Sequence, residues 1–238
     1  VLIHSFLFCQ KGSVSAMRTE SFAMETTIVT SEDGTHTFEI KRTWANGEKG
    51  KAIVIELYPT LDLEHKENFD LSTMHLINHV KELGWCEVRI INLFSKVFSY
   101  KPSSQRLEID IENQAYIEEM LEEAEIKEYD IVICWGSTLQ QNKATQEMKK
   151  EILTMIESKG LAKQTKEITV DTFITSQGLS PHPLYLGLRH AKERWFLQEF
   201  DITAELKKLT KDEKSKSSKK KTERKKKQVT EQEVTADE

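Results

Sequence analysis

The chain has 238 residues, of which 38% are hydrophobic and 31% charged, with nine glycines and only four prolines. This composition excludes collagen-like, disulfide-scaffold and multidomain organisations, and it predicts one globular domain with a sizeable core. The net charge of −5 conceals a split, because residues 207–227 hold 12 Lys and Arg against three acidic residues. The body of the chain is therefore acidic, and its tail is basic.

Three cysteines are scattered along the chain without a C-x-x-C pair, at Cys9, Cys86 and Cys134. This pattern indicates neither a disulfide framework nor a thiolate zinc site, and we expect a reducing, cytoplasmic location. No apolar run reaches the roughly 20 residues that span a bilayer. The apolar start over residues 1–9 lacks the basic residues of a signal peptide, so we interpret residues 1–24 as an N-terminal extension. An export signal, or a start at Met17 or Met24, stays an open alternative.

The first predicted elements are β-strands. Two β-prone runs within residues 26–42 flank an Asp33-Gly34 turn and predict a hairpin. Residues 51–57 and 88–93 are short runs that are apolar on both faces, which favours buried strands of a parallel sheet.

A helix is predicted over residues 70–83, where Asp70 is placed to cap the first turn and Gly84 to end the last. Its expected inward face is a stripe of apolar side chains at helical spacing, namely Leu71, Met74, Ile77, Val80 and Leu83. A second helix is expected over residues 110–126, with an inward face made of Ile111, Ala115 and Leu121.

The same alternation continues. A strand over residues 130–135 precedes a helix over 144–157, and a β-prone run over 167–170 precedes a final helix over 188–200. Strands that alternate with helices of this length predict an α/β domain over residues 25–200, a three-layer sandwich with a mostly parallel central sheet.

The remaining residues, 201–238, contain no aromatic side chain and are rich in Lys and Ser. We expect them to be a basic, low-complexity, disordered tail. Lys219, Lys220 and Arg224 are candidate DNA contacts, because basic residues gain affinity for a polyanion by releasing its counterions. A purely solubilising tail is an equally open alternative.

Polar side chains gather where the predicted strands end. The carboxyl ends of parallel strands form the ligand-binding edge of an open sheet, so we expect these segments to surround one cleft. They are Glu56-Leu-Tyr58-Pro59-Thr60, Asn92-Leu-Phe94, Trp135-Gly136-Ser137 and Ser180-Pro-His182-Pro183-Leu184.

Several familiar sites are absent from the sequence. Neither a dinucleotide-binding G-x-G-x-x-G nor a P-loop is present, and we expect no cofactor. His75 and His79 have the spacing of two zinc ligands on a helix, but Leu76 stands where a zincin has its glutamate, so we expect no metal.

These segments carry a family resemblance. The stretch over residues 42–200 resembles the domain-of-unknown-function 1643 family, which occurs in bacteria and phages. The segments that match are Arg42-Thr-Trp44, Leu57-Tyr-Pro-Thr60, Ile91-Asn-Leu-Phe94, Trp135-Gly136 and His182-Pro-Leu-Tyr-Leu186.

More distantly, the series is similar to the uracil-DNA glycosylase superfamily, in which the same kinds of segment follow one another in the same order. The matching segments are Tyr58-Pro59, Ile90-Ile-Asn-Leu93, Trp135-Gly-Ser-Thr-Leu-Gln140 and His182-Pro-Leu184. This resemblance implies a uracil-DNA glycosylase-like fold and DNA as the partner, and we expect a monomer.

Cleavage of a glycosidic bond in DNA requires an extruded base, a pocket that reads its edge, and stabilisation of the charge that develops. The resemblance implies that Asn92 holds the base edge through its amide, and that Phe94 or Tyr58 stacks on the base. His182 would donate to the departing base. Further DNA contacts are expected from Ser137, Lys143 and Pro183.

Tyr58 stands where the resemblance implies a catalytic Asp or Asn, and a tyrosine is a poor base at neutral pH. We therefore expect Glu56 or Asp62 to activate water or to stabilise the sugar cation, and Tyr58 to reshape the pocket for a modified or damaged base. Modified phage DNA, and hence antiviral defence, is one such substrate hypothesis. Two alternatives stay open: a non-catalytic nucleic-acid-binding module, and an enzyme that acts on free nucleotides or nucleosides.

Overall fold

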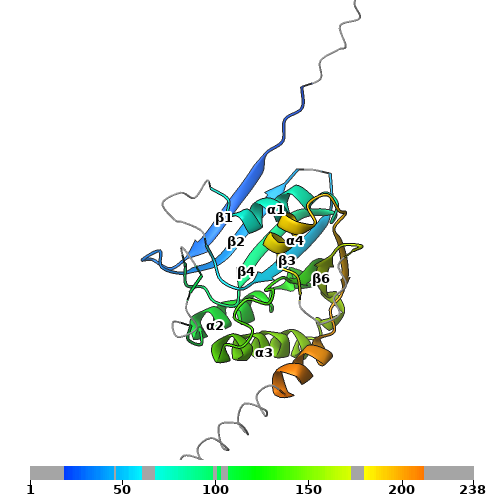
Figure 1. Cartoon of the computed structure of the whole chain (residues 1–238). Helices are drawn as coiled ribbons and strands as arrows, with labels where there is room; N and C mark the ends of the chain where they lie inside the picture. Colours follow the sequence, from blue (N-terminus) through cyan, green and yellow to red (C-terminus); the bar gives the residue numbers. More distant parts are fainter. Residues whose placement is uncertain are drawn as a thin grey trace, which may run out of the picture.

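The computed structural model describes residues 19–45, 47–60, 68–98, 101–102, 107–172 and 180–211, and its centre is a seven-stranded sheet (Figure 1). The strand order is β1-β2-β4-β3-β5-β6-β7. The four central strands, β4-β3-β5-β6, are parallel, whereas β1, β2 and β7 pair antiparallel with their neighbours. The strands are β1 (Met24–Thr30), β2 (Thr37–Trp44), β3 (Gly50–Glu56), β4 (Trp85–Asn92), β5 (Tyr129–Ile133), β6 (Thr165–Thr169) and β7 (Phe196–Glu199).

Helices cover both faces of the sheet, which makes the domain a three-layer α/β sandwich. One face carries α1 and α4, and the other carries α2, α3 and a helix over residues 202–211 (Figure 1). The four labelled helices are α1 (Leu71–His79), α2 (Ile111–Met120), α3 (Lys143–Ser158) and α4 (Pro183–Arg189). Short 3-10 helices lie at Ala124–Glu128 and Ala162–Gln164.

The connections between the parallel strands place the helices. From β3 the chain moves through α1 to β4, whereas from β4 it returns through α2 to β5 and continues through α3 to β6. Because crossovers between parallel strands are right-handed, the opposite directions put α1 on one face and α2 and α3 on the other. The chain therefore leaves β3 and β5 towards opposite faces, and this divergence is where open α/β sheets bind ligands.

Two cores, one on each face, explain the continuous apolar runs of the strands. Ile55 and Ile133 pack towards α2 and α3, whereas Val54 and Val132 pack towards α1 and α4. Since successive side chains of a strand point to opposite faces, a strand buried on both faces has no polar alternation.

Much of the predicted order of elements is confirmed. The hairpin forms β1 and β2, and the predicted strands 51–57, 88–93, 130–135 and 167–170 correspond to β3, β4, β5 and β6. Asp70 caps α1, because its side chain accepts the backbone N–H of Thr73 at 2.7 Å.

The predicted inward faces of the first two helices are wrong in part. Leu71 and Met74 of α1 are 56% and 44% exposed, and Ile111 of α2 is 72% exposed. Ala115 is also exposed. Polar side chains take part of the buried face instead, since Thr73 and His79 of α1 and Asn113 of α2 are buried. The ring of His79 stacks on Trp195 with centroids 3.9 Å apart, so a histidine fills a place that the pattern assigns to an apolar residue.

The predicted helix over residues 188–200 is also wrong. Pro183 occupies the first turn of α4, which ends at Arg189, and residues 196–199 form the edge strand β7. A proline suits the first helical turn because its missing N–H has no partner there. The predicted tail begins too early, because residues 202–211 are helical and both Ile202 and Leu209 belong to the core. The rest of that tail lies outside the described residues.

A tight contact joins α1 to α4. A Cβ atom at Gly187 would lie 1.9 Å from Cγ of His75, so only glycine lets the histidine ring lie against α4. Gly187→Ala is expected to destabilise the fold by about 1–3 kcal/mol, the usual cost of overpacking. Urea unfolding followed by circular dichroism measures this loss.

The matched variant is His75→Ala combined with Gly187→Ala. Removing the ring removes the clash, so the alanine at 187 should cost much less in this background than in the wild type. Strictly additive losses would contradict the contact.

Candidate functional site

A cavity of about 660 Å³ opens at the edge of the sheet where the chain leaves β3 and β5 towards opposite faces. Its walls come from four parts of the chain: the segment after β3, the segment after β5, the loop that leads into α4, and the helices α1 and α4. The residues that carry its chemistry are Glu56, Tyr58, Ser72, Ser137, His182 and Arg189. The position agrees with the expectation that ligands bind beyond the carboxyl ends of parallel strands.

Glu56 is the last residue of β3 and is 6% exposed. Its Oε1 atom is buried and has no hydrogen-bond partner in the described part of the chain. Burial raises the pKa of this carboxyl from 4.5 to about 8, and the charge of Asp70 adds to the rise. Because the charged form is disfavoured, Glu56 holds its proton at neutral pH and is a hydrogen-bond and proton donor.

Asn92 ends the neighbouring strand and pairs in register with Glu56. Paired residues of parallel strands point to the same face about 4.8 Å apart, so their side chains are neighbours. Asn92 is 3% exposed and does not line the cavity, and its Oδ1 atom has no partner among the described residues. Asn92 therefore lies behind Glu56, beside its carboxyl group, and the prediction that its amide holds a base edge in the cavity is corrected.

His182 is the N-cap of α4, and its Nδ1 atom accepts the backbone N–H of Leu184 at 3.2 Å. Burial lowers the pKa of His182 from 6.5 to about 4, so the ring is neutral at physiological pH. A neutral ring whose Nδ1 accepts carries its proton on Nε2, which makes Nε2–H the group available to a ligand.

The loop after β5 lies directly against His182. Gly136 has a φ of 63°, and a Cβ atom there would be 3.0 Å from the Cβ of His182. Glycine is required both by this left-handed conformation and by the close approach. Two of the segments singled out in the sequence, Trp135-Gly136 and His182-Pro183, are thus neighbours.

Tyr58 lines the cavity from the segment after β3, and its ring meets Phe98 edge to face with centroids 5.7 Å apart. Burial raises the pKa of the Tyr58 phenol, so it stays protonated. Ser137 is exposed at the rim, and Lys143 is exposed as the first residue of α3. Pro183 is buried in the first turn of α4.

Two aromatic residues that we expected at the cleft belong to the core. Phe94 is 2% exposed and Trp135 is 2% exposed, and both pack on the α2 and α3 side. The Trp135 ring meets Phe200 edge to face and lies 4.8 Å from the ammonium of Lys149. The prediction that Phe94 stacks on a base is therefore corrected. Asp62, Lys219, Lys220 and Arg224 lie outside the described residues.

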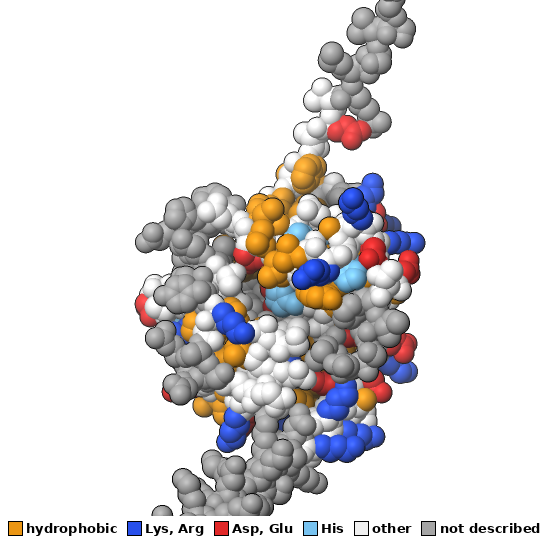
Figure 2. Space-filling model, viewed as in Figure 1, with side chains coloured by type: hydrophobic (Ala, Val, Ile, Leu, Met, Phe, Trp, Pro, Cys, Tyr) orange, Lys and Arg blue, Asp and Glu red, His pale blue; other side chains and the backbone are white. Residues whose placement is uncertain are grey.

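An exposed apolar rim lies beside the cavity, made of Leu71 and Met74 from α1 and Tyr185 and Leu188 from α4. Tyr185 and Leu188 also line the cavity, and Figure 2 shows hydrophobic side chains gathered over these two helices. A contiguous apolar surface beside a cavity is typical of a binding site. Sequence reasoning missed this rim because it assigned Leu71 and Met74 to the core.

Asp70 is a further residue whose influence on the site the sequence did not reveal. Sequence reasoning identified it only as a helix cap, but its charge acts on both Glu56 and His182. Within the described residues, no group of three or more His, Cys, Asp or Glu side chains is placed to hold a metal ion. None of the described helices combines the length and apolar character needed to cross a membrane.

The fold and the cavity define an α/β protein with a cavity at the switch point of a mostly parallel sheet. The chain belongs to the DUF1643 family, described as a protein of unknown function, whose model matches residues 38–184. The match extends from β2 to the start of α4 and includes the cavity segments after β3 and β5, whereas the cavity residues Tyr185, Leu188 and Arg189 of α4 lie beyond it. Comparisons with curated proteins and with solved structures gave no match.

Glu56→Gln is expected to stabilise the protein at neutral pH. The folded pKa of about 8 lies above the ordinary 4.5, so folding takes up a proton between these values and wild-type stability falls as the pH rises through this window. Glutamine stays neutral, so its advantage should grow from pH 4.5 upwards and reach roughly 3 kcal/mol at pH 7.

Denaturant unfolding at several pH values between 4.5 and 8 measures this difference. Glu151→Gln, on the exposed face of α3, is the control and should follow the wild type at every pH. A Glu56→Gln advantage that stays constant with pH would contradict a protonated Glu56.

Proposed function

We propose that the protein is a DNA glycosylase that hydrolyses the N-glycosidic bond of a modified or damaged base and leaves an abasic site. One observation carries the proposal: a proton-bearing carboxyl at Glu56 and a neutral histidine at His182 line the same cavity. Both groups donate hydrogen bonds, which is what a base needs as it departs with negative charge.

The size of the cavity supports a substrate larger than an ordinary base. About 660 Å³ lies within the range of small-molecule sites and leaves room beside a nucleobase for a substituent. Hydroxyl groups of Thr60, Ser72 and Thr138 are part of its lining and provide donors and acceptors for a polar substituent. A modified base, including those of phage DNA, fits this space better than uracil, and such a substrate would make the protein an antiviral defence enzyme.

The apolar rim supports access to a base within a DNA strand. An enzyme that acts on a base rotates it out of the stack, and apolar side chains inserted at the base step help to open it. Leu188 is 65% exposed and Tyr185 46% exposed, and both stand at the cavity. We assign these two side chains to the contact with the bases next to the extruded one.

The chemistry follows from the two donors. The bond between C1′ and the base nitrogen breaks with its electron pair on the base, and Nε2–H of His182 stabilises the negative charge that develops there until the base takes the proton of Glu56. Water then adds to C1′ and gives its proton to the carboxylate of Glu56, which restores the starting state. Glu56 is thus assigned as proton donor first and water activator second.

The order of the segments supports the same assignment. Tyr58, Gly136-Ser137 and His182 line the cavity in the order that resembles the uracil-DNA glycosylase superfamily. The parallel strands also follow the order second, first, third, fourth along the sheet, as doubly wound folds do.

Incubation of the purified protein with single-stranded and duplex DNA, containing natural or modified bases, tests the proposal. We expect alkali-labile breaks at the modified bases, with the rate reduced about 100-fold or more by Glu56→Gln and by His182→Ala, because general acid catalysis and charge stabilisation each contribute at that level. Glu151→Gln should cleave like the wild type. Full binding of DNA without any abasic site would instead identify a non-catalytic module.

The dependence of kcat/KM on pH provides a separate test. Activity requires the protonated form of Glu56 and, on the acid side, the neutral form of His182, because protonation of Nδ1 would break the hydrogen bond from Leu184 N–H that orients the ring. The rate should therefore fall as the pH rises through about 8 and as it drops through about 4. A rate that rises with pH through 8 would contradict this role and would mean that Glu56 acts as a base in the first step.

A further inference from the structure

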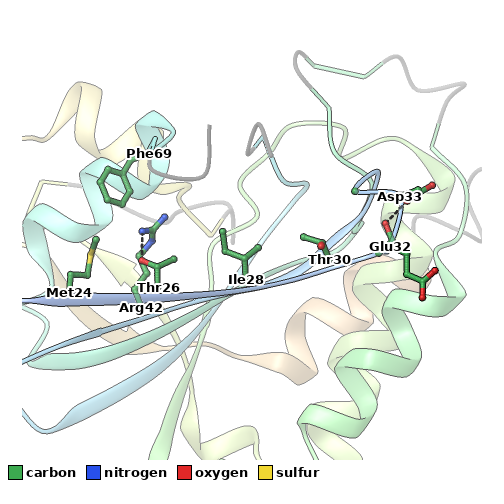
Figure 3. A pocket seen from close by; sticks show the side chains of 10 residues that line it. Met24, Thr26, Ile28, Thr30, Glu32, Asp33, Arg42 and Phe69 are labelled. Carbon is green, nitrogen blue, oxygen red and sulfur yellow. Dashed lines mark hydrogen bonds between the residues drawn. The ribbon is translucent and has the colours of Figure 1, made fainter. Parts of the chain in front are cut away.

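Arg42 belongs to the Arg-x-Trp segment that the proposed function does not use. It lies in β2 and is 2% exposed. Its Nη1 atom donates to Thr26 Oγ1 at 3.0 Å, and its guanidinium carbon lies 4.3 Å from the ring centroid of Phe69 (Figure 3). The Nε atom is buried and has no hydrogen-bond partner in the described part of the chain.

The charge of Arg42 lacks the compensation that buried arginines normally have. Arg89, which is also buried, binds both carboxylate oxygens of Glu39 at 2.9 and 2.7 Å and is also paired with Glu123. Arg42 makes no ion pair with any described carboxylate, although the charge of Asp70 acts on it. Because a buried guanidinium stays charged and is costly without a partner, this arrangement indicates a missing anion.

Arg42 lines a groove of about 770 Å³ that lies over one face of β1. The floor is formed by alternate residues of that strand, and the far end is the β1–β2 turn with Glu32 and Asp33 (Figure 3). Thr30 lies four positions after Thr26 along the strand, a distance of about 13 Å. An anion is therefore attracted to the end with Arg42 and repelled by the end with the acidic turn.

The contacts at the Arg42 end suit a tetrahedral oxyanion. The guanidinium is a planar fork that offers parallel donors, and Thr26 supplies a hydroxyl whose oxygen already accepts from Arg42, so its proton is free to donate to a ligand. Phe69 stacks on the guanidinium and fixes its orientation. These features match phosphate.

We propose that this groove binds a phosphate group of the substrate through the guanidinium fork of Arg42 and the hydroxyl of Thr26. If the proposed function holds, this is a phosphodiester of the strand whose base enters the cavity, and the assignment to a strand rests on that function. Asp70 connects the two places, because its charge acts on Arg42 as well as on Glu56 and His182. The cavity would read the base while the groove holds the backbone beside it.

The test measures binding, so that it is independent of any excision. The full chain carrying Glu56→Gln is titrated against a fluorescent single-stranded oligonucleotide at several salt concentrations, with and without Arg42→Gln. Loss of one phosphate contact should lower the slope of log K against log salt by about 1 and weaken binding at least about tenfold. Unchanged affinity and slope would overturn the proposal.

Lys41→Gln is the matched control, since it removes the same charge from the next residue of β2. The Lys41 ammonium is already paired with Glu87 at 3.2 Å, so this variant should bind like the parent. An equal effect of both variants would mean that only net charge matters, which would also overturn the proposal. If Arg42→Gln fails to fold, Arg42→Lys replaces it: a lysine keeps the charge but not the fork, so affinity should fall severalfold, and parent-like binding would overturn the proposed geometry.

A second arm separates the two sources of phosphate. Inorganic phosphate and a nucleoside 5′-monophosphate are tested for an Arg42-dependent rise in Tm at constant ionic strength. If they raise Tm while Arg42→Gln leaves the binding of the oligonucleotide unchanged, the anion site stands and its assignment to a strand is overturned. Binding of DNA that depends on Arg42, without excision of a base, would support the phosphate site and contradict the glycosylase activity. Excision with a rate and DNA affinity unchanged by Arg42→Gln would support the glycosylase activity and contradict the phosphate site.

Discussion

The burial of a carboxyl group at the end of β3 is the constraint on which the site depends. β3 lies between two parallel neighbours, and Glu56 is the point where the polar cavity begins. A carboxyl group in such a place costs stability unless it is neutral or paired, and the described residues offer Glu56 no partner for its Oε1 atom. Perturbed groups of this kind concentrate where proteins carry out chemistry, because acid and base catalysis require shifted pKa values.

The strands could be predicted from sequence and the helix faces could not, for one physical reason. A strand buried on both sides is marked by an unbroken apolar run, as in β3 and β5, and few other structures produce this pattern. A helix face is identified by counting apolar residues, and here buried polar groups take part of it. His79 stacks on Trp195, and Asn113 donates to the carbonyl groups at the end of β4, so neither is marked by hydrophobicity.

The candidate site was predictable as a set of segments but not as a set of side chains. The strand ends meet because parallel strands bring their carboxyl ends to one edge. Which side chain faces the cavity depends on where each strand stops, and Phe94 and Trp135 turn into the core instead. Asp70 and Arg42 are far apart in sequence and act through charge across the fold, which no local pattern reveals. Arg42 alternates with the apolar residues Ile40 and Trp44 on one face of β2, and this was the available signal for its burial.

The seating of His75 against Gly187 has a consequence for how the protein adapts to a ligand. It holds two short helices from distant parts of the sequence together as one unit, with Asp70 as the N-cap of α1 and His182 as the N-cap of α4. A bulky ligand that displaces one helix must therefore displace the other as well. The two helices would then select ligands by shape as one rigid unit. Accepting a larger ligand would require weakening the contact between His75 and Gly187 before any ligand-contacting residue is changed.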